Sequence, residues 1–117
     1  MKGKSNGKRL RIRCWIDIDG KRFFGPGRAE LLQLIVDTGS ISKAAKSMGM
    51  SYKKAWAMVD DLNASGKKPY VMAHKGGHKG GGTEVTKTGM KVLQAYQKLN
   101  LQLSAISKKN ENILKKI

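Results

Sequence analysis

Few residues in this sequence have the types and spacing that catalysis or metal binding requires. The glycine run at residues 76–82 does not match the phosphate-binding loop Gly-x-x-x-x-Gly-Lys-Ser/Thr, because it places no lysine at the required position. His74 and His78 are separated by glycines, which disfavour the helix that would align both imidazoles on a metal. Asp60 and Asp61 are adjacent on a predicted helix and point in different directions. The sequence therefore predicts no enzyme, no metal site and no cofactor.

Positive charge is the strongest chemical signal in the sequence. The 117 residues include 24 Lys and Arg against 8 Asp and Glu, which gives a formal net charge of +16 and a pI near 10.2. We therefore expect a polyanionic partner. No apolar run approaches the roughly 20 residues that cross a bilayer, and the basic start of the chain lacks the apolar stretch of a signal peptide. The single cysteine, Cys14, excludes an internal disulfide. We expect a cytoplasmic protein with no membrane partner.

The first part of the chain predicts a basic arm followed by a β-hairpin. Residues 1–8 read MKGKSNGK, a composition that cannot bury apolar surface, so we expect a disordered arm before a domain at residues 9–117. From Arg9 the chain alternates strictly as far as Ile18, which predicts a half-buried strand. Asp19 and Gly20 suit a two-residue turn, and residues 21–24 can return as a second strand.

Helical spacing of apolar residues predicts three helices, at about residues 27–37, 40–48 and 51–64. Ser40 and Ser51 are suitable N-caps for the second and third, and Gly49 is suited to end the second. The residues expected to face the core are Leu31, Leu32, Ile35, Val36, Ile41, Ala44, Ala45, Met48, Ala55, Val59 and Leu62, and Tyr52 is expected on a flank beside their stripe.

The second and third predicted helices have the proportions of a helix-turn-helix, with the small Ala45 where they cross and Gly49 in the turn. Residues 70–74 and 83–86 predict a hairpin around the glycine run. Three helices followed by a hairpin is the order of a winged helix-turn-helix. The expected fold class is therefore α+β, mostly α: a winged helix-turn-helix with an N-terminal β-hairpin and a long C-terminal dimerisation helix.

The third predicted helix, residues 51–64, is suited to reading a major groove, because recognition helices read base edges with their N-terminal residues. Helical geometry turns Lys53 and Ala57 outward and places Trp56 on a flank, where we expect it to be mainly structural. The glycine-rich wing, residues 75–82, adds lysines. The candidate DNA-contacting residues are Ser40, Lys43, Ser51, Tyr52, Lys53, Lys54, Ala57, Lys75, Lys79 and Gly80.

A last helix is predicted from about residue 89 to residue 117, with apolar positions in a heptad seam. Such a helix outruns so small a domain, since each residue adds roughly 1.5 Å. We therefore expect a homodimer in which the last helices pair. Between Val92 and Ile117, the proposed dimerisation residues are Tyr96, Leu99, Leu103, Ile106, Asn110 and Ile113.

The motifs together resemble the DNA-binding domain of the ModE family of molybdate-responsive transcription regulators. Residues 39–46 read GSISKAAK, residues 49–56 read GMSYKKAW, and residues 76–82 read GGHKGGG ahead of VTKTG. LysR-type regulators share a related helix-turn-helix, but SYKxAW and the glycine-rich wing favour ModE. The resemblance covers about residues 22–107. It implies a dimeric, sequence-specific regulator that binds double-stranded DNA, with Ser51, Tyr52 and Lys53 in the recognition helix. ModE carries its molybdate sites in further C-terminal domains, so we expect no molybdate site in this chain.

The main alternative is a basic RNA-binding protein or a nucleoid-associated architectural protein without sequence specificity, because bulk charge does not distinguish the two polyanions. RNA-binding modules usually present surface aromatics for stacking. Aromatics are 6% of this sequence, and most are expected to face inward. A membrane-surface role is disfavoured because no helix combines a basic face with large exposed aromatics.

Overall fold

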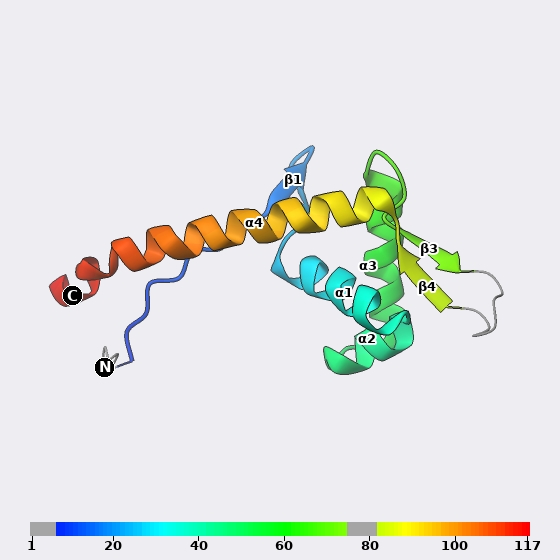
Figure 1. Cartoon of the computed structure of the whole chain (residues 1–117), viewed down its shortest axis with the longest axis horizontal. Coiled ribbons are helices and arrows are strands. Elements are labelled where there is room, and N and C mark those ends of the chain that lie inside the picture. Colours follow the sequence, from blue (N-terminus) through cyan, green and yellow to red (C-terminus); the bar gives the residue numbers. More distant parts are fainter. Residues whose placement is uncertain (1–6, 75–81) are drawn as a thin grey trace.

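Two β-hairpins and four α-helices make up residues 7–74 and 82–117, the part of the chain that a computed structural model describes. The N-terminal hairpin pairs β1 (Ile16–Ile18) with β2 (Lys21–Phe24), and the second hairpin pairs β3 (Val71–His74) with β4 (Gly82–Val85). The helices are α1 (Pro26–Thr38), α2 (Ile41–Ser47), α3 (Tyr52–Ser65) and α4 (Lys87–Lys109), and a 3₁₀ helix η1 (Glu111–Lys116) follows. Figure 1 shows α1, α2, α3 and the second hairpin gathered at one end of α4.

Turn and cap residues set the boundaries of these elements. Asp19 and Gly20 both have positive φ in the first hairpin turn, as a two-residue turn of this kind requires. Gly39 ends α1 in the left-handed conformation (φ 69°), and Gly49 adopts the same region (φ 67°) between α2 and α3. The helices predicted at 27–37, 40–48 and 51–64 therefore form within two residues of their expected bounds.

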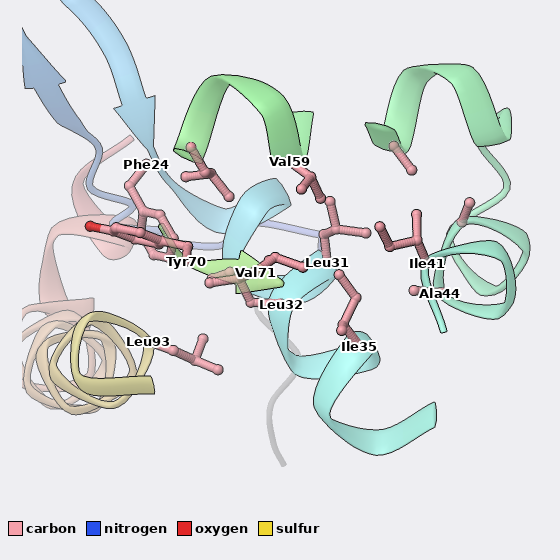
Figure 2. Close-up of a cluster of buried hydrophobic side chains, with 14 of the residues drawn as sticks. Phe24, Leu31, Leu32, Ile35, Ile41, Ala44, Val59, Tyr70, Val71 and Leu93 are labelled. Atoms are coloured by element: carbon pink, nitrogen blue, oxygen red, sulfur yellow. The ribbon is translucent and has the colours of Figure 1, made fainter. Parts of the chain in front are cut away.

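The core lies where α1, α2 and α3 meet the first part of α4, as Figure 2 shows. Phe24 and Tyr96 meet edge to face, with ring centroids 5.1 Å apart, which joins β2 to α4. Val36, which the spacing assigned to the core, is instead 42% exposed. The largest fully buried side chains are Phe24, Leu31, Leu32, Ile35, Leu62, Leu93 and Val59.

The expected fold class is confirmed. The helix-turn-helix α2–α3 is followed by the hairpin β3–β4 and a long C-terminal helix, and an N-terminal β-hairpin precedes them. In the described part of the chain, no helix is both long and apolar enough to span a membrane.

The strand predicted from Arg9 to Ile18 is wrong over most of its length, because only Ile16–Ile18 form β1. β2 has four residues and offers no partner to the rest. The preceding main chain instead binds side chains of α4: Tyr96 Oη donates to the Cys14 carbonyl (2.8 Å), and Ser107 Oγ donates to the Leu10 carbonyl (2.7 Å). Residues 7–15 thus form a strap along α4. Of the predicted basic arm, residues 1–6 lie outside the described residues.

The last helix is shorter than the sequence predicts. α4 ends at Lys109, and the chain then tightens into η1. Asn110 is the C-cap of α4 rather than a helical residue, with its Nδ2 donating to the Ile106 carbonyl (2.8 Å). The predicted helix to residue 117, with Asn110 within a continuous seam, is therefore wrong. α4 also begins two residues earlier than expected, with Thr86 Oγ1 accepting from the Gly89 amide.

Candidate nucleic-acid interface

The helix-turn-helix is fixed by side-chain caps at the start of both helices. Ser40 Oγ accepts from the Lys43 amide, and Ser51 Oγ accepts from the Lys54 amide, each at 3.0 Å. Each cap satisfies an amide that the helix leaves without a partner. Because a serine hydroxyl can accept and donate at once, both hydroxyl hydrogens remain able to donate to a phosphate oxygen.

One face of α3 is buried and the opposite face is open to solvent. Ala55, Val59 and Leu62 are fully buried, whereas Lys53 and Ala57 are exposed. This division follows from the helical repeat, since the exposed residues lie roughly 160° from the centre of the buried stripe. The structure therefore brings the candidate residues at the start of α3 onto one accessible surface.

Lysines occupy the first turns of α2, α3 and α4, where the helix dipole favours acidic residues. Lys43 lies in the first turn of α2, Lys53 and Lys54 in that of α3, and Lys87 begins α4, while none of these turns contains an acidic residue. A cation at a helix N-terminus is unfavourable by a few tenths to about 1 kcal/mol. A bound anion would be attracted both to these lysines and to the helix N-termini, which makes these helix starts suited to phosphates.

The aromatic residues of α3 lie on a flank of the helix. Tyr52, at the edge of the apolar stripe, is 56% exposed, and Trp56, expected to be mainly structural, is 37% exposed and so is covered over most of its surface. Their rings meet edge to face with centroids 6.3 Å apart. Both lie on the flank of α3 that turns toward β4, because the helical repeat places positions 52 and 56 to one side of the buried stripe.

A groove of about 790 Å³ lies beside this flank, between α3, the start of α2 and β4. Tyr52 and Trp56 form one wall, and Ser42 and Lys43 belong to another. The exposed Val36 also lines it. The groove thus joins the recognition helix predicted from the sequence to the strand that follows the predicted wing.

Two backbone hydrogen bonds hold the second hairpin, one to the end of α1 and one that continues the pairing of its own strands. The Thr83 amide donates to the Gly39 carbonyl (3.0 Å), and the Thr86 amide donates to the Tyr70 carbonyl (2.9 Å). β4 is therefore held beside the end of α1 as well as beside β3. The candidate wing residues Lys75, Lys79 and Gly80 lie outside the described residues.

Asn63 positions β3, a role that the sequence analysis did not predict. Its Oδ1 accepts from the amides of Tyr70 (2.8 Å) and Val71 (3.1 Å), and its Nδ2 donates to the Val71 carbonyl (2.9 Å). One side chain on α3 thus satisfies three backbone groups at the start of the strand. The available signal in the sequence was a side-chain amide directly after the apolar Leu62, where a polar group lies at the edge of the core.

Gly89 allows α4 to pass close to β3 and β4. A Cβ at this position would lie 2.5 Å from the Tyr70 carbonyl oxygen and 2.7 Å from Val85 Cγ1. Both approaches are closer than a side chain tolerates. The sequence placed Gly89 only at the start of the last helix, because nothing local reveals that another segment crosses there.

The predicted dimerisation residues do not share one environment. Tyr96 is buried in the core of its own chain, and Leu103 lines a cavity with residues of the strap. The remaining apolar members are open to solvent, with Leu99 39%, Ile106 48% and Ile113 51% exposed. The structure therefore divides the predicted seam at about Tyr96. Among the described residues, no group of His, Cys, Asp and Glu is placed to hold a metal ion.

Comparison with known proteins identifies relatives over most of the chain. The molybdenum transport protein ModE of Azotobacter vinelandii is 34% identical over 90% of this chain and 39% of its own length. The DNA-binding transcriptional dual regulator ModE of Escherichia coli K12 is 37% identical over 72% of this chain and 32% of its own length. The molybdenum-pterin-binding protein MopB of Rhodobacter capsulatus is 46% identical over 62% of this chain and 27% of its own length.

No protein-family profile matches the sequence. The chain spans between 32% and 39% of the length of the ModE proteins of E. coli and A. vinelandii. The identity nevertheless extends over most of the present chain, which confirms the resemblance inferred from its motifs. Over most of its length, this chain is a homologue of the ModE transcriptional regulators.

Proposed function

We propose that this chain is a DNA-binding module of a transcription regulator and that it recognises specific duplex sequences as a homodimer. The observation that carries the proposal is the open face of α3, which presents Lys53 and Lys54 at a helix start without an acidic counterpart. A duplex binding partner is consistent with the net charge of +16, and we place the protein in the cytoplasm as part of the same proposal.

The proposed contacts are of two kinds: contacts to base edges, which determine sequence specificity, and contacts to phosphates, which position the protein on the duplex. Lys53, Tyr52 and Ala57 lie on or beside the exposed face of α3 and would meet base edges, because the N-terminal part of a recognition helix enters the major groove. Ser40, Lys43, Ser51 and Lys54 lie at the starts of α2 and α3 and would hold phosphates. We assign the wing residues Lys75, Lys79 and Gly80 to the phosphate backbone from the sequence alone.

Exposed aromatics also favour the RNA-binding alternative more than the sequence suggested. Trp15, Tyr52 and Trp56 are all more than a third exposed, and such residues can stack on unpaired bases. A competition experiment distinguishes the two functions: labelled duplex DNA is displaced by unlabelled duplex DNA or by RNA at the same salt concentration. We expect duplex DNA to compete better, and equal or better competition by RNA would contradict the proposal.

Salt dependence tests the role of the wing. If Z phosphates are neutralised, the logarithm of the binding constant falls with a slope of about −0.9Z against the logarithm of salt concentration. Lys75→Ala with Lys79→Ala should flatten this slope and weaken binding to all duplex sequences alike. An unchanged slope would exclude the wing from the interface.

The homodimer is proposed from the exposed apolar residues of α4 after Tyr96. Leu99 and Ile106 lie on the same helix face and keep 39% and 48% of their surface exposed, and Ile106 also lines a cavity with Leu10 and Ile12 of the strap. Pairing of two such helices would direct two α3 helices toward half-sites about 34 to 36 Å apart. Leu99→Glu with Ile106→Glu should give monomers in sedimentation and reduce affinity for an inverted repeat by about 100-fold or more. A monomeric wild type with full affinity for a single half-site would contradict this arrangement.

A further inference from the structure

Neither the proposed phosphate contacts nor the proposed base contacts explain the position of Trp56 on α3. Its indole is 37% exposed on the helix flank, and the edge-to-face contact with Tyr52 orients it. The other aromatic side chains of the core pack inward, as Phe24 and Tyr96 do. An apolar ring held at the open surface of a cationic helix is suited to contact an apolar group of a polyanionic ligand.

The groove beside Trp56 combines an apolar wall with a cationic and hydroxylic one. Lys43 and Ser42 line the side formed by α2, while Glu84 from β4 is the acidic residue among the described lining residues. A phosphate would therefore lie on the Lys43 side. The group next to that phosphate, on the same strand, would then face the wall formed by Tyr52 and Trp56.

The major groove displays one apolar group, the C5-methyl of thymine, among hydrogen-bond donors and acceptors. We propose that Trp56, oriented by Tyr52, packs against a thymine methyl and makes thymine recognition part of the specificity of this chain. This inference rests on the proposed function, since it requires that α3 enters the major groove. Lysine contacts to phosphates position the protein without reading sequence, so the aromatic pair supplies discrimination that they lack.

Replacing thymine by deoxyuridine tests this contact, because it removes the methyl and leaves the hydrogen-bonding groups of the base unchanged. Bound sequences are first selected from two random duplex pools, one containing thymine and one containing deoxyuridine throughout. The sequences selected from the thymine pool are then measured in both forms at one salt concentration. We expect the affinity of the wild type to fall roughly fourfold for each contacted methyl that is removed.

The variant Trp56→Ala should bind the two forms equally, because it lacks the surface that the methyl contacts. The matched control is Trp15→Ala, which removes an indole of similar exposure (43%) from the strap, just before β1, and should keep the full discrimination. If Trp56→Ala does not fold, Trp56→Gln serves in the same comparison. A Trp15→Phe variant leaves Trp56 as the sole indole, and its fluorescence should change more with thymine duplex than with deoxyuridine duplex.

Three outcomes would overturn the inference. Equal wild-type affinity for the two forms of a selected sequence would exclude the methyl contact while leaving sequence-specific binding intact. Discrimination that persists in both Trp56→Ala and Trp56→Gln would assign it to another residue. Failure to enrich any sequence from either pool would contradict the proposed function itself, and the thymine contact with it.

Discussion

The two halves of α4 have the same apolar spacing but different surroundings. In the first half, Leu93 is fully buried and Tyr96 is 2% exposed, against β2 and the other helices. In the second half, Leu99 is 39% exposed and Ile106 is 48% exposed, and the strap is the part of the chain that accompanies the helix. A periodic stripe of apolar residues therefore identifies the apolar face of a helix without identifying what covers it.

The largest predicted effect is on the free energy of unfolding, which should depend strongly on the first half of α4 and little on the second. Leu93→Ala removes a fully buried side chain at the centre of the core, so it should lower the free energy of unfolding by about 2 to 5 kcal/mol. Leu101→Ala is the matched control and should change it by less than about 0.5 kcal/mol. Urea unfolding measures both. Similar losses in the two variants would show that the second half is also covered in solution.

A second prediction compares lysines at the two ends of the molecule. Lys53→Ala should weaken binding to a specific site by roughly 1 to 3 kcal/mol more than binding to random duplex, if this lysine meets a base edge. Lys108→Ala removes the same charge from the last turn of α4 and should weaken both duplexes slightly and equally. Titrations at one salt concentration make the comparison. Equal losses on both duplexes for Lys53→Ala would make it a phosphate contact.

The strap should open more easily than the core, and Ser107→Ala tests this. The substitution removes the hydrogen bond to the Leu10 carbonyl, which should cost about 1 kcal/mol locally. Amide hydrogen exchange should accelerate in residues 9–14, while the urea midpoint of the whole domain stays nearly constant. If the urea midpoint falls in step with the loss of exchange protection in residues 9–14, the strap and the core unfold together.

The smallest predicted effect concerns the ion pair between Arg28 of α1 and Asp61 of α3. The hydrogen bond from Arg28 holds the pKa of the Asp61 carboxyl below its ordinary value of 3.8. Because the folded state favours the carboxylate, the pair stabilises the protein above that pH and loses its contribution as the pH falls below it. The Asp61 side chain is 45% exposed, so we expect less than about 1 kcal/mol.

Asp61→Asn should therefore reduce the loss of stability below pH 4, measured by urea unfolding at a series of pH values. Asp60→Asn, which neutralises the neighbouring exposed carboxylate of α3, is the control. A steeper loss in Asp61→Asn than in the wild type would contradict the sign of this prediction.

Local signals in the sequence predicted most of the fold. Ser40, Gly49 and Ser51 define the helix-turn-helix, because capping and left-handed glycines act within a few residues. The strap shows the opposite case: its alternation is that of a strand, but α4 rather than a second strand binds its carbonyl groups. Alternation reveals an apolar edge and not the identity of the partner.

The candidate site was predicted unevenly for the same reason. Lys53 and Ala57 could be placed outward because the helical repeat alone decides their direction. The groove beside Trp56 and the hydrogen bonds of Asn63 could not be predicted, since they depend on β4 and β3, which reach α3 only in the folded molecule. Residues that act through distant segments leave little trace in local spacing.

The bonds from Thr83 to Gly39 and from Thr86 to Tyr70 have a consequence for how such a module could diversify. The first joins β4 to the end of α1 and the second continues the strand pairing, and neither involves the connection between His74 and Gly82. Changes in the length or composition of that connection, in evolution or in the laboratory, should therefore leave the positions of β4 and α3 unchanged. Under the proposed function, mutations in the connection would then change the affinity for duplex DNA, and mutations in α3 would change the sequence specificity.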